Sequence, residues 1–296
     1  MKQEMLLILN PNAGTRQARR FLPEMISCFT RAGYLCTVCI TEQRGDAAAF
    51  AREHAGRAGL VVACGGDGTL NEMITGLQLG NHSTPLGYIP CGSTNDFASG
   101  LGLPAAPLAA CEAIVSGTPH TLDARLFGAD RYFCYTASFG AFTSVSWSTP
   151  QNIKNVFGHA AYILEGIRSL ADIRPIHMRI TADGQVYEDD YIFGAICNST
   201  SLGGVLKLEH NEVHMSDGLF ETLLIPFPPD LLALNRILTA LRTHHYADPS
   251  LSFLRASSYL FEGPPDIVWT LDGEAADGVA RTEIRNIHNA FRILCP

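Results

Sequence analysis

Lysine is scarce in this chain. Of the 21 basic side chains only Lys2, Lys154 and Lys207 are lysines, and 29 acidic residues bring the formal net charge to -8. Proteins that hold nucleic acid by releasing counterions need a basic face, so this balance argues against a nucleic-acid partner. Any anionic ligand must instead be held locally, by arginine side chains or by backbone N–H groups.

Long apolar runs are missing as well. No uninterrupted apolar stretch reaches the roughly 18–20 residues needed to cross a bilayer, and the N-terminus lacks the apolar core of a cleavable signal. The nine cysteines are scattered, and several lie inside apolar runs, where a reduced thiol packs as a small hydrophobic group. These features predict a cytoplasmic protein that is soluble or rests on a membrane surface.

Two common nucleotide-binding motifs are absent. No G-x-x-x-x-G-K-[ST] sequence occurs, and no G-x-G-x-x-G follows the first predicted strand, so the chain is not a P-loop protein. The C-x-x-C spacing of Cys36 and Cys39 falls in a predicted strand, where residues three apart point to opposite faces. We therefore expect no metal or redox role for that pair.

The first 123 residues alternate short apolar runs with helical patterns. The runs have the composition of strands that are buried on both faces. Regular alternation of strand and helix predicts parallel βαβ units, and so a three-layer α/β domain with helices on both faces of a parallel sheet. The predicted strands are residues 5–9, 34–40, 60–64 and 85–90.

The second part of the chain has a different pattern. Consecutive strand-like segments follow one another with turn residues between them, which predicts an antiparallel, all-β sandwich. Helical insertions are expected near residues 154–171 and 229–243. We place the domain boundary at Asp123, which gives domains of residues 1–123 and 124–296.

A glycine-rich turn follows the third predicted strand. Ligands of open parallel sheets bind beyond the carboxyl ends of the strands, which is where this turn begins. Its glycines, Gly65, Gly66 and Gly68, permit positive φ angles and leave no Cβ between the backbone N–H groups and a bound oxyanion. Turns at residues 8–15 and 89–98 occupy equivalent positions, and together the three predict a phosphate-binding edge.

Thr69 and Glu72 have the T-x-x-E spacing of a capping box, and for Glu72 we prefer that structural explanation. Asp67 is harder to explain locally. A carboxylate in an anion-binding turn repels phosphate unless a cation lies between them, and Mg²⁺ is the usual mediator.

Asp272 and Glu274 form a second acidic cluster. If both lie in one strand, they point to the same face, and Gly273 leaves room for a close backbone approach. Two acids on one face are costly unless they share a proton, a cation or a reaction. The alternative is an ordinary Asp-Gly hairpin turn followed by solvated acids.

Nearly the whole chain resembles the diacylglycerol kinase catalytic family, especially its bacterial lipid kinases. The resemblance depends on "GGDGTLNE", "PLGYIPCGSTNDFA" and a late "LDGE" in this order. It implies a nucleotide domain, a β-sandwich, and catalysis in the cleft between them. It further implies ATP as phosphoryl donor, bound by Asn10, Asn12, Thr41, Gly65, Gly66, Asp67, Gly68, Thr69, Asn71, Thr94 and Asn95.

The same resemblance implies the catalytic groups. Glu274 would accept the proton of the acceptor hydroxyl, Asp67 would organise Mg²⁺ and ATP, and Asp272 would lie beside them; the first two roles could be exchanged. A structural Mg²⁺ would be held by Asp217 and by the backbone carbonyls of Leu219 and His214.

Asp123 matches a family acid that we interpret as structural. At the metal turn, Ser216 stands where relatives often have an acid, which weakens the prediction of a bound ion there.

A lipid acceptor predicts an enzyme that is transiently peripheral to the inner face of the membrane. Residues 139–167 are the candidate membrane contact, although their helical spacing favours a place in the core. The acceptor could be diacylglycerol-like, phosphatidylglycerol-like or sphingoid, and a homodimer stays open. Two other functions also stay open: a kinase of a soluble acceptor, similar to NAD kinases, and a nucleotide-binding regulatory module without turnover.

Overall fold

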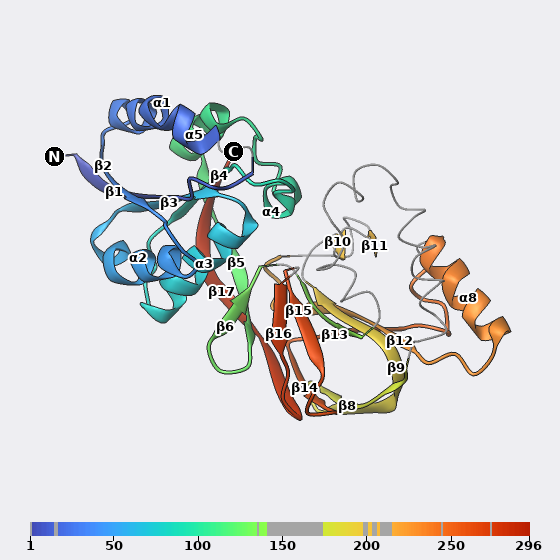
Figure 1. The fold of residues 1–296 in the computed structure, drawn as a ribbon. Helices are drawn as coiled ribbons and strands as arrows, with labels where there is room; N and C mark the ends of the chain where they lie inside the picture. Colours follow the sequence, from blue (N-terminus) through green and yellow to red (C-terminus); the bar gives the residue numbers. More distant parts are fainter. Residues whose placement is uncertain are drawn as a thin grey trace. The chain divides into compact units, whose positions relative to one another are not determined.

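The structure, a computed structural model, describes residues 2–14, 17–134, 136–140, 174–197, 201–202, 206–207, 215–243, 245–272 and 274–296. It divides into two compact units (Figure 1). The first comprises Met1–Cys134, Ser216–Gly218 and Ile287–Pro296, and the second Tyr135–Met215 and Leu219–Asn286. The end of the chain thus belongs to the first unit. The domain boundary expected at Asp123 from composition stays a prediction.

A parallel sheet forms the centre of the first unit. Its strands are β1 (Gln3–Leu9), β2 (Tyr34–Ile40), β3 (Leu60–Gly65) and β4 (Leu86–Pro90), in the order β4-β3-β1-β2. Every residue of β3 and β4 is buried, as expected for strands covered on both faces. The end of β17 (Arg281–Cys295) extends the sheet, pairing in parallel with β4 at Ile293 and Leu86.

Helices cover both faces of this sheet (Figure 1). One face carries α1 (Gln17–Arg31) and α5 (Pro107–Ser116), and the other carries α2 (Asp46–His54) and α3 (Asp67–Leu79). A short 3-10 helix, η1 (Ala55–Arg57), follows α2, and α4 (Asp96–Gly100) follows β4. The predicted three-layer α/β arrangement is therefore confirmed.

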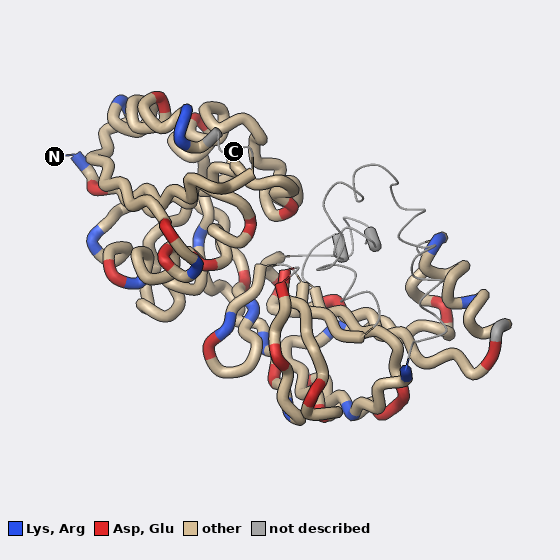
Figure 2. Tube along the Cα trace, in the orientation of Figure 1, with Lys and Arg blue, Asp and Glu red and all other residues tan. Residues whose placement is uncertain are grey.

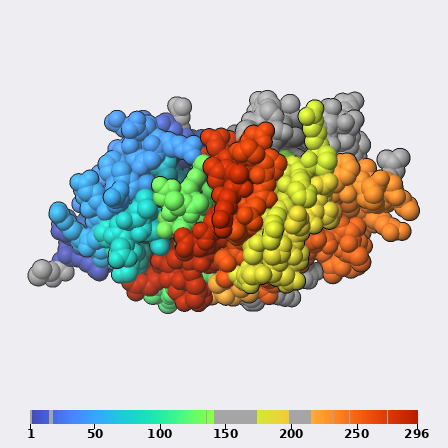
Figure 3. All heavy atoms as spheres, turned by 90° about the horizontal axis from the view of Figure 1, so that it is seen from below, coloured from blue at the N-terminus to red at the C-terminus, as the bar shows by residue number. Residues whose placement is uncertain are grey.

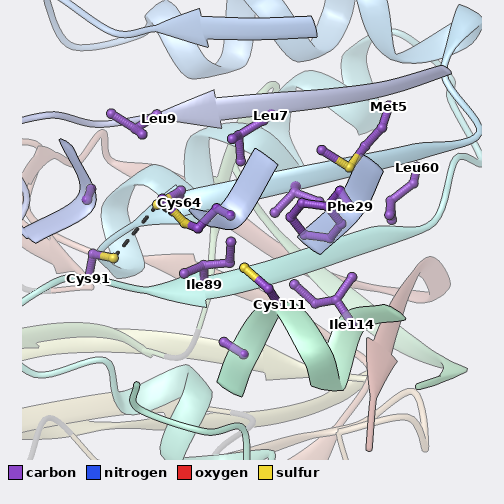
Figure 4. Close-up of a cluster of buried hydrophobic side chains, with 14 of the residues drawn as sticks. Met5, Leu7, Leu9, Phe29, Leu60, Cys64, Ile89, Cys91, Cys111 and Ile114 are labelled. Carbon is purple, nitrogen blue, oxygen red and sulfur yellow. Dashed lines mark hydrogen bonds between the residues drawn. The ribbon is translucent and has the colours of Figure 1, made fainter. Parts of the chain in front are cut away.

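The core under α1 and α5 is apolar and contains several sulfur atoms (Figure 4). Met5, Leu7 and Leu9 alternate along β1 and face this side, as the two-residue period of a strand requires. Phe29 of α1 and Cys111 of α5 lie opposite them and are fully buried.

The first unit is completed by an antiparallel hairpin and by the last residues of the chain. The hairpin consists of β5 (Thr118–Phe127) and β6 (Arg131–Phe133). At the chain end, Arg292 donates to the carbonyl oxygen of Ser83 (2.6 Å), and Gln78 donates to that of Ala290 (2.8 Å). Figure 3 shows the C-terminal residues in red beside the cyan segment that leads into β4.

The second unit is built of antiparallel strands, as predicted. Its strand order is β16-β15-β7-β9-β8-β14-β17, with β12 pairing to both β9 and β13. The long strand β9 pairs with β8 through its first half and with β7 and β12 through its second half. The strands of this unit are β7 (Thr136–Gly140), β8 (Ile176–Ala182), β9 (Gln185–Cys197), β10 (Ser201–Leu202), β11 (Leu206–Lys207), β12 (Phe220–Pro226), β13 (Ser252–Ala256), β14 (Ser258–Glu262), β15 (Val268–Leu271), β16 (Glu274–Asp277) and the start of β17.

Aromatic side chains fill the core of the second unit. The Trp269 ring lies 5.0 Å from that of Phe139 and 5.1 Å from that of Phe261, both edge-on, a favourable geometry for aromatic pairs. The helical insertion predicted near 229–243 is present as α8 (Leu231–Arg242). The insertion predicted near 154–171, and most of the proposed membrane segment 139–167, lie outside the described residues.

Basic and acidic residues are interspersed along the described chain (Figure 2). In the part of the chain that the structure describes, no helix has the length and apolar character that crossing a membrane requires.

Candidate functional site

Three turns of the first unit meet at the carboxyl edge of its parallel sheet. They follow β1, β3 and β4. The Asn10 side-chain amide donates to the Thr69 hydroxyl (3.2 Å), which joins the first turn to the second. A Cβ atom placed on Gly92 would lie 2.6 Å from Cα of Gly66, so the second and third turns are in close contact. The expectation that these turns lie together is confirmed.

The glycines of these turns serve mainly to let one turn pack on another. Gly65, Gly66 and Gly68 lack the positive φ angles expected from the sequence, whereas Gly14 has one, at 50°. A Cβ atom on Gly14 would meet the carbonyl oxygen of Cys91 at 2.4 Å, but one on Gly68 would find nothing within 4 Å. Gly68 therefore keeps space open at the start of α3.

Helix α3 begins at Asp67 rather than near Thr69, with no side-chain cap hydrogen bond. The predicted capping box is wrong. The Glu72 carboxylate instead accepts hydrogen bonds from the backbone N–H groups of Gly45 (2.9 Å) and Ala47 (3.2 Å), at the start of α2. Glu72 thus caps the neighbouring helix, and the first N–H groups of α3 have no side-chain cap.

The Asp67 carboxylate joins the turn after β3 to the turn after β4. Its Oδ1 accepts from the backbone N–H of Phe97 (3.3 Å) and from the Tyr88 hydroxyl (3.4 Å). Its Oδ2 accepts from the backbone N–H of Asp96 (3.1 Å) and from the Thr94 hydroxyl (3.4 Å). The side chain is buried, and because burial disfavours the charged form, it raises the pKa of Asp67.

Tyr88 and Asp96 belong to this site, although they are not among the predicted site residues. The Tyr88 hydroxyl lies 3.4 Å from Oδ1 of Asn95 as well as from Asp67, and burial followed by the Asp67 charge raises the pKa of Tyr88. The pKa of Asp96 is also raised, by burial first and by Asp67 second. Tyr88 could have been recognised from the sequence, because its hydroxyl is the one polar side-chain group in the run Leu86–Pro90.

Asn12 and Thr41 lie beside the first turn. The Asn12 N–H donates to Oδ1 of Asn10 (2.9 Å), which closes a local turn. The Thr41 N–H donates to the carbonyl oxygen of Leu9 (3.0 Å). These two predicted nucleotide contacts therefore occupy the same sheet edge as Asn10.

Asn95 and Asn71 stabilise the surroundings of the turns. Asn95 has a left-handed backbone with φ 52°, and its side chain bonds both the N–H (2.8 Å) and the carbonyl oxygen (3.0 Å) of Gly92. Asn71 donates to the carbonyl oxygen of Tyr132 in β6 (3.1 Å). Its Oδ1 is buried and has no hydrogen-bond partner among the described residues.

The second acidic cluster is a hairpin. Leu271 at the end of β15 pairs with Glu274 at the start of β16, and Asp272 in the turn has φ 50°, as a two-residue Asp-Gly turn requires. The Asp272 carboxylate accepts from the backbone N–H of Thr136 in β7 (3.0 Å), while Glu274 is exposed. The expectation of one shared strand face is wrong, and the hairpin alternative is confirmed; Gly273 lies outside the described residues.

The turn predicted to bind a structural metal is described in part. His214 lies outside the described residues. Asp217 is exposed, and the carbonyl oxygen of Leu219 accepts a hydrogen bond from the side-chain amide of Asn286 (3.1 Å). The metal role of these residues stays a prediction.

The hydrogen bonds of Asp67 compete with direct ligation of Mg²⁺ by its carboxylate. A carboxylate offers about four acceptor positions, and both oxygens of Asp67 already accept two hydrogen bonds each. Across the described ranges, no group of three or more His, Cys, Asp or Glu side chains is placed to hold a metal ion. The role of Asp67 in binding Mg²⁺ and ATP stays a prediction.

Asp123 has the structural role expected of it. The side chain is fully buried in β5, and its carboxylate accepts from the backbone N–H groups of Gly218 (2.8 Å) and Asn289 (2.9 Å). His288 Nδ1 lies 3.0 Å from the same carboxylate. One buried acid thus holds three chain segments of the first unit together.

Replacing Asp123 by alanine is expected to lower the free energy of unfolding by about 2–3 kcal/mol, because two backbone N–H groups lose their acceptor. Urea denaturation measures this loss. Asp230→Ala is the matched control, since Asp230 is an exposed N-cap whose carboxylate accepts from the N–H of Ala233 (2.7 Å). Loss of such an N-cap lowers the free energy of unfolding by about 1 kcal/mol. Equal losses in the two variants would contradict the special role of Asp123.

Comparison with known proteins identifies the family. Residues 4–126 match the model of the diacylglycerol kinase catalytic domain, and residues 137–295 match the YegS C-terminal NAD kinase beta sandwich-like domain. A protein named diacylglycerol kinase from Bacillus subtilis (strain 168) is 30% identical over 293 residues, covering 98% of this chain and 95% of that protein. The chain belongs to the diacylglycerol kinase family. A second protein of that name, from Staphylococcus epidermidis, is 31% identical over 299 residues, covering 100% of this chain and 93% of the relative.

Solved structures of similar proteins share the fold of this family member. A crystal structure described as a diacylglycerol kinase from Bacillus anthracis str. Sterne has a TM-score of 0.79 at 23% identity and covers 99% of this chain and 97% of its own. Another structure from the same organism has a TM-score of 0.82 at 24% identity, with coverages of 99% and 95%. The predicted α/β domain followed by a β-sandwich is thereby confirmed.

Family membership confirms the predicted activity class as well. The chain is a lipid kinase that uses ATP, and so a phosphotransferase with an alcohol acceptor.

Proposed function

We propose that this family member transfers the γ-phosphoryl group of ATP to the hydroxyl of diacylglycerol or a closely related lipid alcohol. The observation that carries this proposal is the meeting of three turns beside the start of α3, which has no side-chain cap. The first N–H groups of a helix and the positive end of its dipole favour phosphate at such a position. The names of the relatives support diacylglycerol as the acceptor.

The triphosphate is proposed to lie at Gly68 and Thr69, where a Cβ on Gly68 would meet no other atom within 4 Å. Asn10, Asn12 and Thr41 approach it from the turns after β1 and β2, and Thr94 and Asn95 from the turn after β4. Mg²⁺ bound together with ATP would neutralise part of the phosphate charge.

Glu274 is proposed to take the proton of the acceptor hydroxyl. Phosphoryl transfer asks the protein mainly for positioning and for removal of that proton. Glu274 is exposed at the first position of β16. Asp272 supports this hairpin through its bond to Thr136.

A lipid acceptor also places the reaction at a membrane surface. We propose that the protein associates transiently with the inner face of the membrane, as a peripheral contact. None of the described helices is long and apolar enough to cross a membrane. A homodimer stays a prediction that sedimentation would test.

An acceptor screen tests the proposed function. Diacylglycerol, phosphatidylglycerol and sphingosine in mixed micelles, and NAD in solution, are each incubated with labelled ATP. We expect label in diacylglycerol at a rate at least ten-fold above the rate with NAD. Transfer to NAD alone would identify a kinase of a soluble acceptor, and ATP binding without transfer to any acceptor would identify a regulatory module.

A further inference from the structure

Two cysteines lie in contact beneath the proposed nucleotide site. Cys64 is the residue before Gly65 in β3, and Cys91 directly follows β4. Their Sγ atoms are 3.7 Å apart (Figure 4). The backbone holds them there, because the Cys91 N–H donates to the carbonyl oxygen of Gly65 (2.7 Å).

The two cysteines differ in their burial and in the direction in which their pKa values are shifted. Cys64 is fully buried, whereas Cys91 is 9% exposed. The hydrogen bond between the two thiols lowers the pKa of Cys91 and, together with burial, raises the pKa of Cys64. Cys91 is therefore the better source of thiolate, the form that reacts with oxidants.

We propose that Cys64 and Cys91 form a peroxide-sensitive dithiol, which closes to a disulfide and thereby weakens nucleotide binding. In the first step the Cys91 thiolate attacks hydrogen peroxide, which gives a sulfenic acid and hydroxide. In the second step the Cys64 sulfur attacks the sulfenic sulfur and releases water. The proton that the Cys91 thiol released on ionising neutralises the hydroxide. In total the two thiols lose two electrons and two protons, and one peroxide becomes two waters.

The effect on the nucleotide follows from the tight packing of the turns. A disulfide brings the sulfur atoms to about 2.05 Å, from the present 3.7 Å. The turns that follow the two cysteines have little slack, since a Cβ on Gly92 would already lie 2.6 Å from Cα of Gly66. Formation of the disulfide therefore displaces the Asp67 carboxylate relative to its hydrogen-bond donors in the turn after β4. This second half of the proposal rests on the proposed function.

Peptide mapping and nucleotide binding test the two halves separately. The reduced protein and protein treated with hydrogen peroxide are digested without reduction, and cross-linked peptides are identified by mass spectrometry. Binding of a non-hydrolysable ATP analogue is measured on the same samples. We expect a Cys64–Cys91 link and at least a ten-fold weaker affinity, both reversed by dithiothreitol.

Matched variants separate this pair from the other thiols. Cys91→Ala and Cys64→Ala should each bind the analogue like the reduced wild type and keep that affinity after peroxide. Cys39→Ser, which removes a partly exposed thiol outside the pair, should lose affinity like the wild type. Oxidation without the Cys64–Cys91 link, or equal loss of affinity in Cys91→Ala, would overturn the proposal. Failure of the reduced protein to bind the analogue would instead count against the proposed function, while the mapped link still decides the dithiol.

Discussion

Glu274→Gln is expected to lower kcat by about 10²–10⁴-fold, the usual contribution of a general base. The amide keeps the size of the side chain but cannot accept the proton of the acceptor hydroxyl. The Kd for ATP should change by no more than a few-fold, because the turns proposed to bind the phosphates belong to other elements. Steady-state rates with the acceptor found in the screen, and calorimetric titration with ATP, measure the two quantities.

A matched control for this variant lies in the same strand. Asp277 is a second exposed acid of β16, so Asp277→Asn changes the charge of the hairpin by the same amount. It should keep kcat within about two-fold, as expected for an exposed carboxylate with no part in the reaction. Substantial turnover in Glu274→Gln would remove Glu274 from the base role.

Asp67→Asn is expected to weaken ATP binding at least ten-fold and to lower kcat as well. The N–H groups of Asp96 and Phe97 now donate to different carboxylate oxygens (3.1 and 3.3 Å), so the new NH2 group would face one of them while the amide oxygen accepts from the other. Donor facing donor leaves buried groups unpaired, at a cost of about 1–3 kcal/mol, and the turn after β4 would move. Calorimetric titration and limited proteolysis near α4 measure both effects.

The control for Asp67 is a carboxylate with similar local bonds and no link to the site. Asp248 accepts from the N–H (2.8 Å) and the hydroxyl (2.7 Å) of Ser250, so Asp248→Asn should leave ATP binding unchanged. Wild-type affinity in Asp67→Asn would contradict the positioning role. Burial raises the pKa of Asp67, so its carboxylate takes up a proton at a higher pH than an exposed aspartate does. As the pH is lowered, ATP binding should therefore weaken at a higher pH than the pKa of an exposed aspartate would predict.

Local sequence signals were sufficient for the parallel sheet. Residues 34–40 and 60–64 were predicted as strands, and the structure has Tyr34–Ile40 and Leu60–Gly65. Each is a short run of mostly apolar residues between turn residues, so neighbouring residues alone define it. The place of the site followed as well, since the carboxyl ends of parallel strands share one edge.

The hairpin at Asp272 shows where such signals are ambiguous. Alternating residues around an Asp-Gly pair fit either one strand with two acids on a face or two strands with a turn. The bond from Thr136, which is 136 positions away in sequence, holds Asp272 in the turn. No local pattern contains that contact.

The sequence by itself determined the fold class, the family and the edge of the sheet at which the turns meet, because these depend on periodicity and on motifs of adjacent residues. Only the tertiary structure decided which partners the acids take. Glu72 caps a helix 27 positions away rather than its own, and Asp67 holds a turn 29 positions away. A carboxylate accepts from whichever donors the packed fold brings within reach, and that choice is made after the elements have assembled.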